Sequence, residues 1–188
     1  MKNKYLKSSV LAAMFLALGI VLTFLTGQIP QIGKMLLPMH IPAILCGLIC
    51  GPVYGCAVGI IMPLLRSVIF SAPPIYPMAV AMAFELGTYG LVSGLLYKKT
   101  AKTNALSVYP ALIGAMLAGR AVWGIVMCVL LGIGKSGFTF KMFFASAFVT
   151  ALPGIVLQLL VIPFIIFIIN KSNLMPFGTG EQKNENKP

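Results

Sequence analysis

The fold class follows from an apolar stretch near the start of the chain. Residues 8–26 read SSVLAAMFLALGIVLTFLT and contain no charged side chain. A helix needs about 20 predominantly apolar residues to cross the hydrocarbon core of a bilayer. The stretch is long for the apolar region of a signal peptide, and no small-residue cleavage site follows it closely. It therefore predicts a retained transmembrane helix.

The composition extends this prediction to most of the chain. Of the 188 residues, 59% are hydrophobic and 9% are charged, whereas soluble domains carry about 25% charged residues. We expect an all-α membrane bundle that forms a single domain over residues 1–170, followed by a polar, disordered tail over residues 171–188. Six transmembrane helices are expected, over residues 8–26, 39–50, 52–71, 78–97, 108–133 and 142–169.

Glycine and proline organise these helices. Gly51-Pro52 separates the second helix from the third, because proline favours the first turn of a new helix. Glycines stand four apart on both sides of this break and in the fourth helix, and small residues let membrane helices approach closely. In the sixth helix, Pro153-Gly154 and Pro163 are expected to cause kinks.

The lysines set the predicted orientation. With the N-terminus inside, six crossings place nine lysines in inside segments and three in outside segments. Cytoplasmic segments of membrane proteins carry such an excess, so both termini are predicted to be cytoplasmic. The segment 39–50 is short for a crossing, at about 18 Å, but the lysine bias would be lost without it. The net charge of +11 is therefore interpreted as topogenic, rather than as a nucleic-acid-binding face.

Three ionisable residues fall inside the expected helices: Arg66, Glu85 and Arg120. Each costs about 2.5–3.5 kcal/mol at a helix centre on insertion scales, so each should face the bundle interior. Residue counts from the outer helix ends place Arg66 about 8 Å deep, Glu85 about 10 Å deep and Arg120 about 20 Å deep. These depths predict an Arg66–Glu85 pair and leave Arg120 without an obvious protein partner.

A buried guanidinium without a protein partner is expected to bind an anion, and a carboxylate satisfies it bidentately. The alternative is that Arg120 bonds backbone carbonyls freed at Pro153, or extends toward the membrane interface. Trp123, Tyr89 and Gln158 are expected near the same depth. Together with the three charged residues they predict a substrate-binding cavity that opens outward.

The remaining reactive residues argue against an enzyme. The chain has no Asp, and the paired acids and metal clusters of intramembrane enzymes are missing from the sequence. His40, the single histidine, is interpreted as a helix-start residue, and the four cysteines as small packing residues. Gly134-Lys135-Ser136 resembles the end of a phosphate-binding loop, but Val129 occupies the position of its first glycine. We expect no metal and no cofactor in this chain.

Two motifs carry a resemblance to a known family. Residues 37–42 read LPMHIP and residues 50–55 read CGPVYG, across the break between the second and third helices. The first helix carries the small-residue motif Ala13-x-x-x-Ala17. With six helices in under 200 residues and a basic N-terminus, these features resemble the S components of energy-coupling factor (ECF) vitamin transporters over residues 8–170.

The resemblance implies a substrate-capture subunit in a bacterial plasma membrane. It would bind a vitamin outside and deliver it inward through a transmembrane coupling protein and two ATPases, which use the ATP. Ala13 and Ala17 would dock on the coupling protein, and residues 27–38 would cover the site. The chain lacks the tryptophan-rich site of thiamin members, since Trp123 is its only tryptophan, and the N-terminal histidine of nickel and cobalt members.

The substrate and two other function classes stay open. Two arginines and one glutamate favour an acidic or zwitterionic vitamin, with pantothenate first and nicotinate, lipoate, folate or riboflavin as alternatives. A stand-alone channel or secondary carrier for a small organic anion is a second function class. The single membrane acid and the missing inverted repeat argue against proton coupling. A scaffold protein without a ligand is the third.

Overall fold

The structure is a computed structural model of the chain, and it describes residues 2–27, 38–100, 108–133 and 151–171. These ranges contain six α-helices, one π-helical turn and no strand. The elements are α1 (Lys2–Gly27), α3 (His40–Cys50), α4 (Pro52–Phe70), η1 (Ile75–Ala79), α5 (Val80–Thr100), α6 (Val108–Ile133) and α8 (Leu152–Lys171). The predicted all-α membrane bundle is confirmed. Lys171, the first residue of the predicted tail, is the last residue of α8, and residues 172–188 lie outside the described residues.

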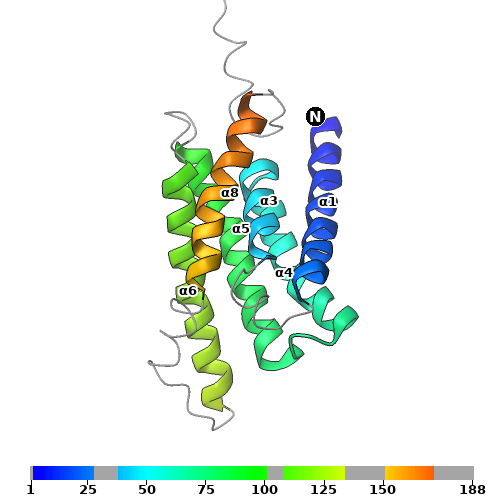
Figure 1. Cartoon of the computed structure of the whole chain (residues 1–188), viewed down its shortest axis with the longest axis vertical. Coiled ribbons are helices and arrows are strands. Elements are labelled where there is room, and N and C mark those ends of the chain that lie inside the picture. The colour runs from blue at the N-terminus through cyan, green and yellow to red at the C-terminus, as the bar shows by residue number, and fades with distance from the viewer. Residues whose placement is uncertain (1, 28–37, 101–107, 134–150, 172–188) are drawn as a thin grey trace, which may run out of the picture.

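Successive helices run in alternating directions (Figure 1). The start of α1 and the last turns of α5 and α8 lie at the same end of the bundle. Those last turns carry Lys98, Lys99 and Lys171. The lysine-bearing ends therefore group together, as the lysine count requires. That this end faces the cytoplasm stays a prediction.

The crossings are of two kinds. Five helical segments are long and apolar enough to span a membrane: α1, α4, η1 with α5, α6 and α8. The remaining helix, α3, is the second in chain order. It has 11 residues, and all of them are buried. It packs against α1, α4 and α5 and runs opposite to α1 and α4 (Figure 1). Because α3 lies inside the bundle, its length need not match the bilayer.

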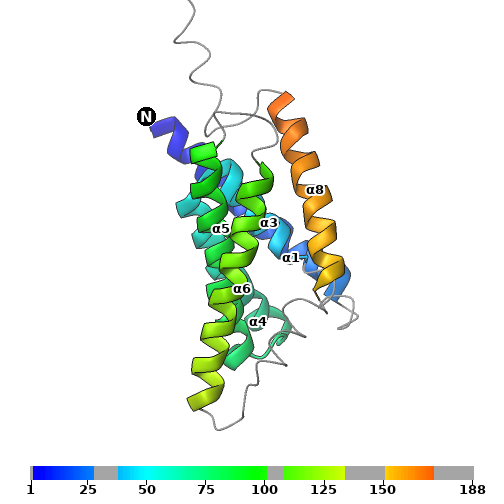
Figure 2. The same ribbon diagram turned by 90° about the vertical axis from the view of Figure 1, so that its left-hand side faces the viewer.

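Helix α5 lies at the centre of the bundle, against α3, α4 and α6 (Figure 2). Glycines bring three of these helices into backbone contact. A Cβ added to Gly55 of α4 would lie 2.5 Å from the Cα of Gly47 in α3 and 2.8 Å from the carbonyl oxygen of Gly90 in α5. Such distances leave room only for glycine. This glycine seam, formed by Gly47, Gly55 and Gly90, fixes α3 and α4 on α5.

The helix ends confirm some boundaries and correct others. Helix α6 has the predicted bounds, and Gly51 separates α3 from α4 with φ 102°, a value that favours glycine. The predicted helix start at 78 falls within the irregular turn η1, in which Tyr76 has extended backbone angles (φ −110°, ψ 135°), and α1 begins at Lys2 instead of 8. Pro153 does not kink a continuous helix. It stands in the first turn of α8. Backbone N–H groups of the first turn make no hydrogen bond within the helix, so a proline there costs none.

Candidate functional site

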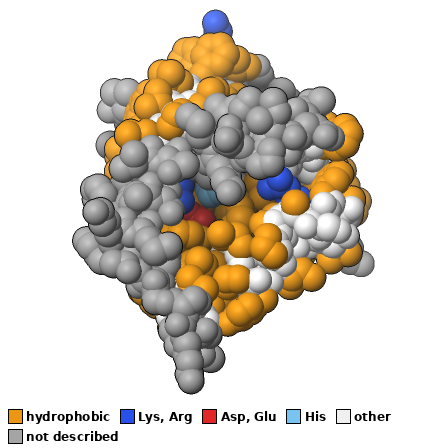
Figure 3. Space-filling view, turned by 60° about the horizontal axis from the view of Figure 1, so that its bottom comes forward, with side chains coloured by type: hydrophobic (Ala, Val, Ile, Leu, Met, Phe, Trp, Pro, Cys, Tyr) orange, Lys and Arg blue, Asp and Glu red, His pale blue; other side chains and the backbone are white. Residues whose placement is uncertain are grey.

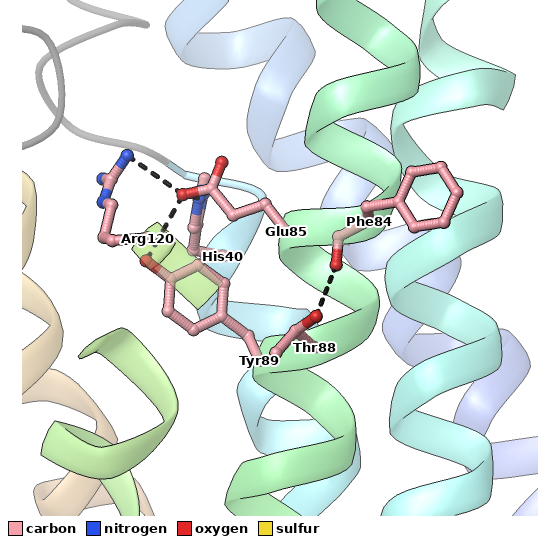
Figure 4. Close-up of polar contacts among 6 residues, drawn as sticks. All are labelled: His40, Phe84, Glu85, Thr88, Tyr89 and Arg120. Carbon is pink, nitrogen blue, oxygen red and sulfur yellow. Dashed lines mark hydrogen bonds and ion pairs between the residues drawn. The ribbon is translucent and has the colours of Figure 1, made fainter. Parts of the chain in front are cut away.

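Four polar side chains meet in the interior of the bundle, around Glu85 of α5. The Glu85 Oε1 lies 3.0 Å from the Arg120 Nη1 of α6 and 3.7 Å from the His40 Nε2 of α3. The Tyr89 hydroxyl donates a hydrogen bond to the same oxygen, at 3.4 Å. Figure 4 shows these side chains pointing toward one another from three helices. We call His40, Glu85, Tyr89 and Arg120 the Glu85 cluster.

Local helix geometry explains how the cluster forms. Glu85 and Tyr89 are four residues apart and therefore share one face of α5. Gly119, next to Arg120, lets α6 approach that face, because an added Cβ would lie 3.1 Å from the Tyr89 ring and 3.2 Å from the Glu85 carbonyl oxygen. The Tyr89 ring also meets the His40 ring edge to face, with centroids 5.1 Å apart and an interplanar angle of 68°.

The Glu85–Arg120 ion pair is almost fully buried. The side chains are 2% and 9% exposed, respectively. Two charges removed from water are tolerated when they neutralise each other, whereas removal of one partner leaves a costly unpaired charge. Glu85 therefore stabilises the buried guanidinium of Arg120.

Several buried nitrogens, four in the cluster and one on α8, have no hydrogen-bond partner among the described residues. They are His40 Nδ1 and Nε2, Arg120 Nε and Nη2, and Gln158 Nε2. More than nine in ten buried polar groups in native structures are hydrogen-bonded, so these atoms indicate a place for a ligand or for water. The Nε and Nη2 atoms form the side edge of the guanidinium, which binds a carboxylate through two parallel hydrogen bonds.

The cluster lies near an open hollow. Figure 3 views the end of the bundle opposite to the start of α1, and shows acidic, histidine and basic side chains inside a hollow that hydrophobic side chains border on one side. The lysine count predicts this end to face outside. Among the described residues, no group of three or more His, Cys, Asp or Glu side chains forms a metal site.

The predicted Arg66–Glu85 pair is wrong. Glu85 pairs with Arg120, and the Nη1 of the half-buried Arg66 lies 4.0 Å from the Met39 Sδ. Helix α6 extends past its neighbours at this end (Figure 1). Counting from its end therefore overstated the depth of Arg120.

The other predicted site residues divide into two groups. Tyr89 joins the cluster, as described. Trp123 is buried on α6 beside Ala81 and Met127, in a separate apolar cluster. Gln158 of α8 is 1% exposed, and its Nε2 has no hydrogen-bond partner among the described residues. The structure thus brings together three of the six predicted substrate-binding residues.

His40 is the member of the cluster that the sequence interpretation missed. It starts α3 as expected, and it is fully buried. A signal was available, because ionisable residues within membrane segments are rare and mostly functional. The chain has a single histidine, and it stands in an apolar segment.

Comparison with known proteins agrees with this architecture. The family model for the substrate-specific component of ECF transporters matches residues 7–166. No curated protein and no solved structure matches the chain. The matched residues include every helix that forms the Glu85 cluster. The family is one of transporter subunits rather than enzymes, and its members are multi-pass membrane proteins. The chain therefore belongs to the family of substrate-specific components of ECF transporters.

Proposed function

We propose that this substrate-binding subunit captures a small monocarboxylic vitamin outside a bacterial cell, with pantothenate as the first candidate. A transmembrane coupling protein and two cytoplasmic ATPases complete the importer. The observation that carries the choice of an acid is the side edge of Arg120, whose Nε and Nη2 are buried and have no partner among the described residues.

Glu85 explains why that edge is available. It contacts Nη1, at one end of the guanidinium, and so holds the group in place while Nε and Nη2 remain unpaired. A ligand carboxylate on these two atoms would form a bidentate, charge-assisted contact. Arginine suits this task better than lysine, because its planar fork matches a carboxylate.

Charge balance is compatible with a ligand that has one negative charge. Glu85 and Arg120 neutralise each other, and Arg66, which lies outside the Glu85 cluster, adds one positive charge inside the bundle that one carboxylate would balance. Uncompensated charge in a membrane interior is costly. Pantothenate, nicotinate and lipoate each carry one carboxylate. Folate, which carries two, and riboflavin, which carries none, fit the charge less well.

The remaining predicted residues take supporting parts in this proposal. Tyr89 supplies aromatic surface beside Arg120. Trp123, which packs with Ala81 and Met127, would supply more about one turn further along α6, and Gln158 would supply a buried amide donor from α8. Arg66 is half-buried and adds positive charge that attracts an anion. Ala13 and Ala17 are exposed on α1, which supports their proposed part in docking on the coupling protein.

The direct test is ligand binding by the purified chain alone. Thermal shift and calorimetry would screen pantothenate, nicotinate, lipoate, folate and riboflavin. We expect pantothenate to bind more tightly than pantothenyl alcohol, in which a CH₂OH group replaces the carboxylate. Arg120→Gln should remove that preference, with a loss of about tenfold or more for pantothenate.

Two results would contradict the proposal. One is that no vitamin of the panel binds the wild-type protein. The other is that Arg120→Gln weakens the acid and the alcohol equally, which would place the carboxylate elsewhere. Flux through proteoliposomes that hold the chain without ATPases would favour the stand-alone channel or carrier instead.

A further inference from the structure

His40 has no part in the carboxylate contact, yet it is the most completely buried member of the Glu85 cluster. Its exposed fraction is 0%, and neither ring nitrogen has a hydrogen-bond partner among the described residues. Its Nε2 lies 3.7 Å from the Glu85 Oε1, beyond hydrogen-bond distance. A buried imidazole without a hydrogen bond is an exception that calls for a physical explanation.

Packing, not hydrogen bonding, holds the ring in place. Helix α3 is buried along its whole length, and the glycine seam fixes it against α4 and α5. The edge-to-face contact with Tyr89 sets the orientation of the imidazole. Both nitrogens of His40 are therefore available for a ligand, without loss of any hydrogen bond within the described residues.

The chemistry of the ring indicates what it would bind. A neutral imidazole offers one donor and one acceptor. A hydroxyl group is likewise donor and acceptor at a single atom, so it suits this ring in either tautomer. Figure 4 shows the His40 ring beside Glu85, on which the Arg120 guanidinium also converges. Both groups lie within 3.7 Å of the Glu85 Oε1, so their separation is within the span of one small molecule.

We propose that His40 is a specificity-determining residue that binds a hydroxyl group of the ligand, while Arg120 binds its carboxylate. The substrate class is then a small hydroxylated monocarboxylic acid. This inference rests on the proposed function, because it uses the same hollow, but it concerns a different group of the ligand. Discrimination by hydrogen bonding is strong, because a ligand without the hydroxyl leaves buried polar groups unpaired.

A consequence for the empty protein separates this role from a structural one. An unpaired buried imidazole destabilises the fold, and an apolar side chain of similar size removes that cost. His40→Leu should therefore raise the melting temperature of the ligand-free protein while it weakens binding. A histidine needed for folding would give the opposite change.

The experiment compares two probes that differ only in their hydroxyl groups. Pantothenate has a carboxylate, an amide and two hydroxyls, and N-(3,3-dimethylbutanoyl)-β-alanine lacks both hydroxyls. By calorimetry, His40→Leu should weaken pantothenate about tenfold or more and leave the deoxy analogue unchanged. His40→Asn, which keeps a donor and an acceptor, should restore part of the loss. Arg120→Gln, measured in parallel, should weaken both probes.

The outcomes separate this inference from the proposed function. Equal losses for the two probes, no loss, or a lower melting temperature of ligand-free His40→Leu would overturn the role of His40. So would a wild-type protein that binds only acids without a hydroxyl. In each case the effect of Arg120→Gln still reports on vitamin capture. Failure of every vitamin to bind the wild-type protein overturns the proposed function, and the role of His40 with it.

Discussion

Glu85 and Arg120 form an ion pair that occupies only one end of the guanidinium. The Oε1–Nη1 distance is 3.0 Å, and the Nε and Nη2 atoms on the other edge have no partner among the described residues. Glu85 thereby neutralises the buried charge of Arg120 but leaves part of the hydrogen-bonding capacity of the guanidinium unused. The remaining edge of the guanidinium is where the proposed carboxylate contact would form.

Glu85→Gln should destabilise the empty protein because it leaves the buried Arg120 charge uncompensated. The expected loss is about 3–5 kcal/mol in the free energy of unfolding. Thermal unfolding in detergent would measure it. A saturating carboxylate ligand should recover part of the loss by supplying the missing charge, so the ligand-induced rise in melting temperature should exceed that of the wild type.

Two further variants control this prediction. Thr88→Val changes a half-buried side chain of the same helix, whose hydroxyl donates a hydrogen bond to the Phe84 carbonyl, and should alter stability little. Glu85→Gln combined with Arg120→Met removes both charges and should restore most of the stability, because the unpaired charge is gone. Wild-type stability in the Glu85→Gln single variant would show that the ion pair does not hold Arg120.

The glycine seam makes a second prediction, about folding. Gly90→Ala should lower the free energy of unfolding by about 1–3 kcal/mol or more. Its Cβ would meet the backbone of Gly55, which cannot move aside as a flexible side chain can. Gly114→Ala is the matched control on α6. Its Cβ would meet only the Cδ1 of Leu96, the far end of a flexible side chain. If both variants unfold at the same temperature, the seam does not determine the packing of α4 on α5.

Much of the fold could be predicted from the sequence, and the pairing within the site could not. Apolar length gave the bounds of α6, and Gly51-Pro52 gave the break before α4, since both depend on local chemistry. The partner of Glu85 depends on relative helix depth. Residue counts assume that all helix ends lie in one plane, and α6 extends past its neighbours (Figure 1). His40 was missed because its burial comes from the packing around α3.

The lysine distribution predicts which end of the bundle faces outside. In a background without the native cysteines, Ile75→Cys and Lys99→Cys would place single thiols on exposed positions at opposite ends. A membrane-impermeant maleimide applied to intact cells should label the first and spare the second. Lysed cells should allow both to react, as a control for accessibility. Labelling of Lys99→Cys alone in intact cells would reverse the orientation and place the hollow on the cytoplasmic side.

The small residues of α1 make the last prediction, which separates capture from delivery. Ala13 and Ala17 are exposed on α1, so larger side chains there should not disturb the core. Ala13→Leu with Ala17→Leu should leave pantothenate binding unchanged and abolish ATP-dependent uptake, because close helix approach requires small residues. Uptake of labelled pantothenate into proteoliposomes that contain the coupling protein and both ATPases would measure this. Ala121→Leu, an equal change at an exposed alanine of α6, should retain uptake. Full uptake by the α1 double variant would show that delivery does not use this face, and the site of capture would be unaffected by that result.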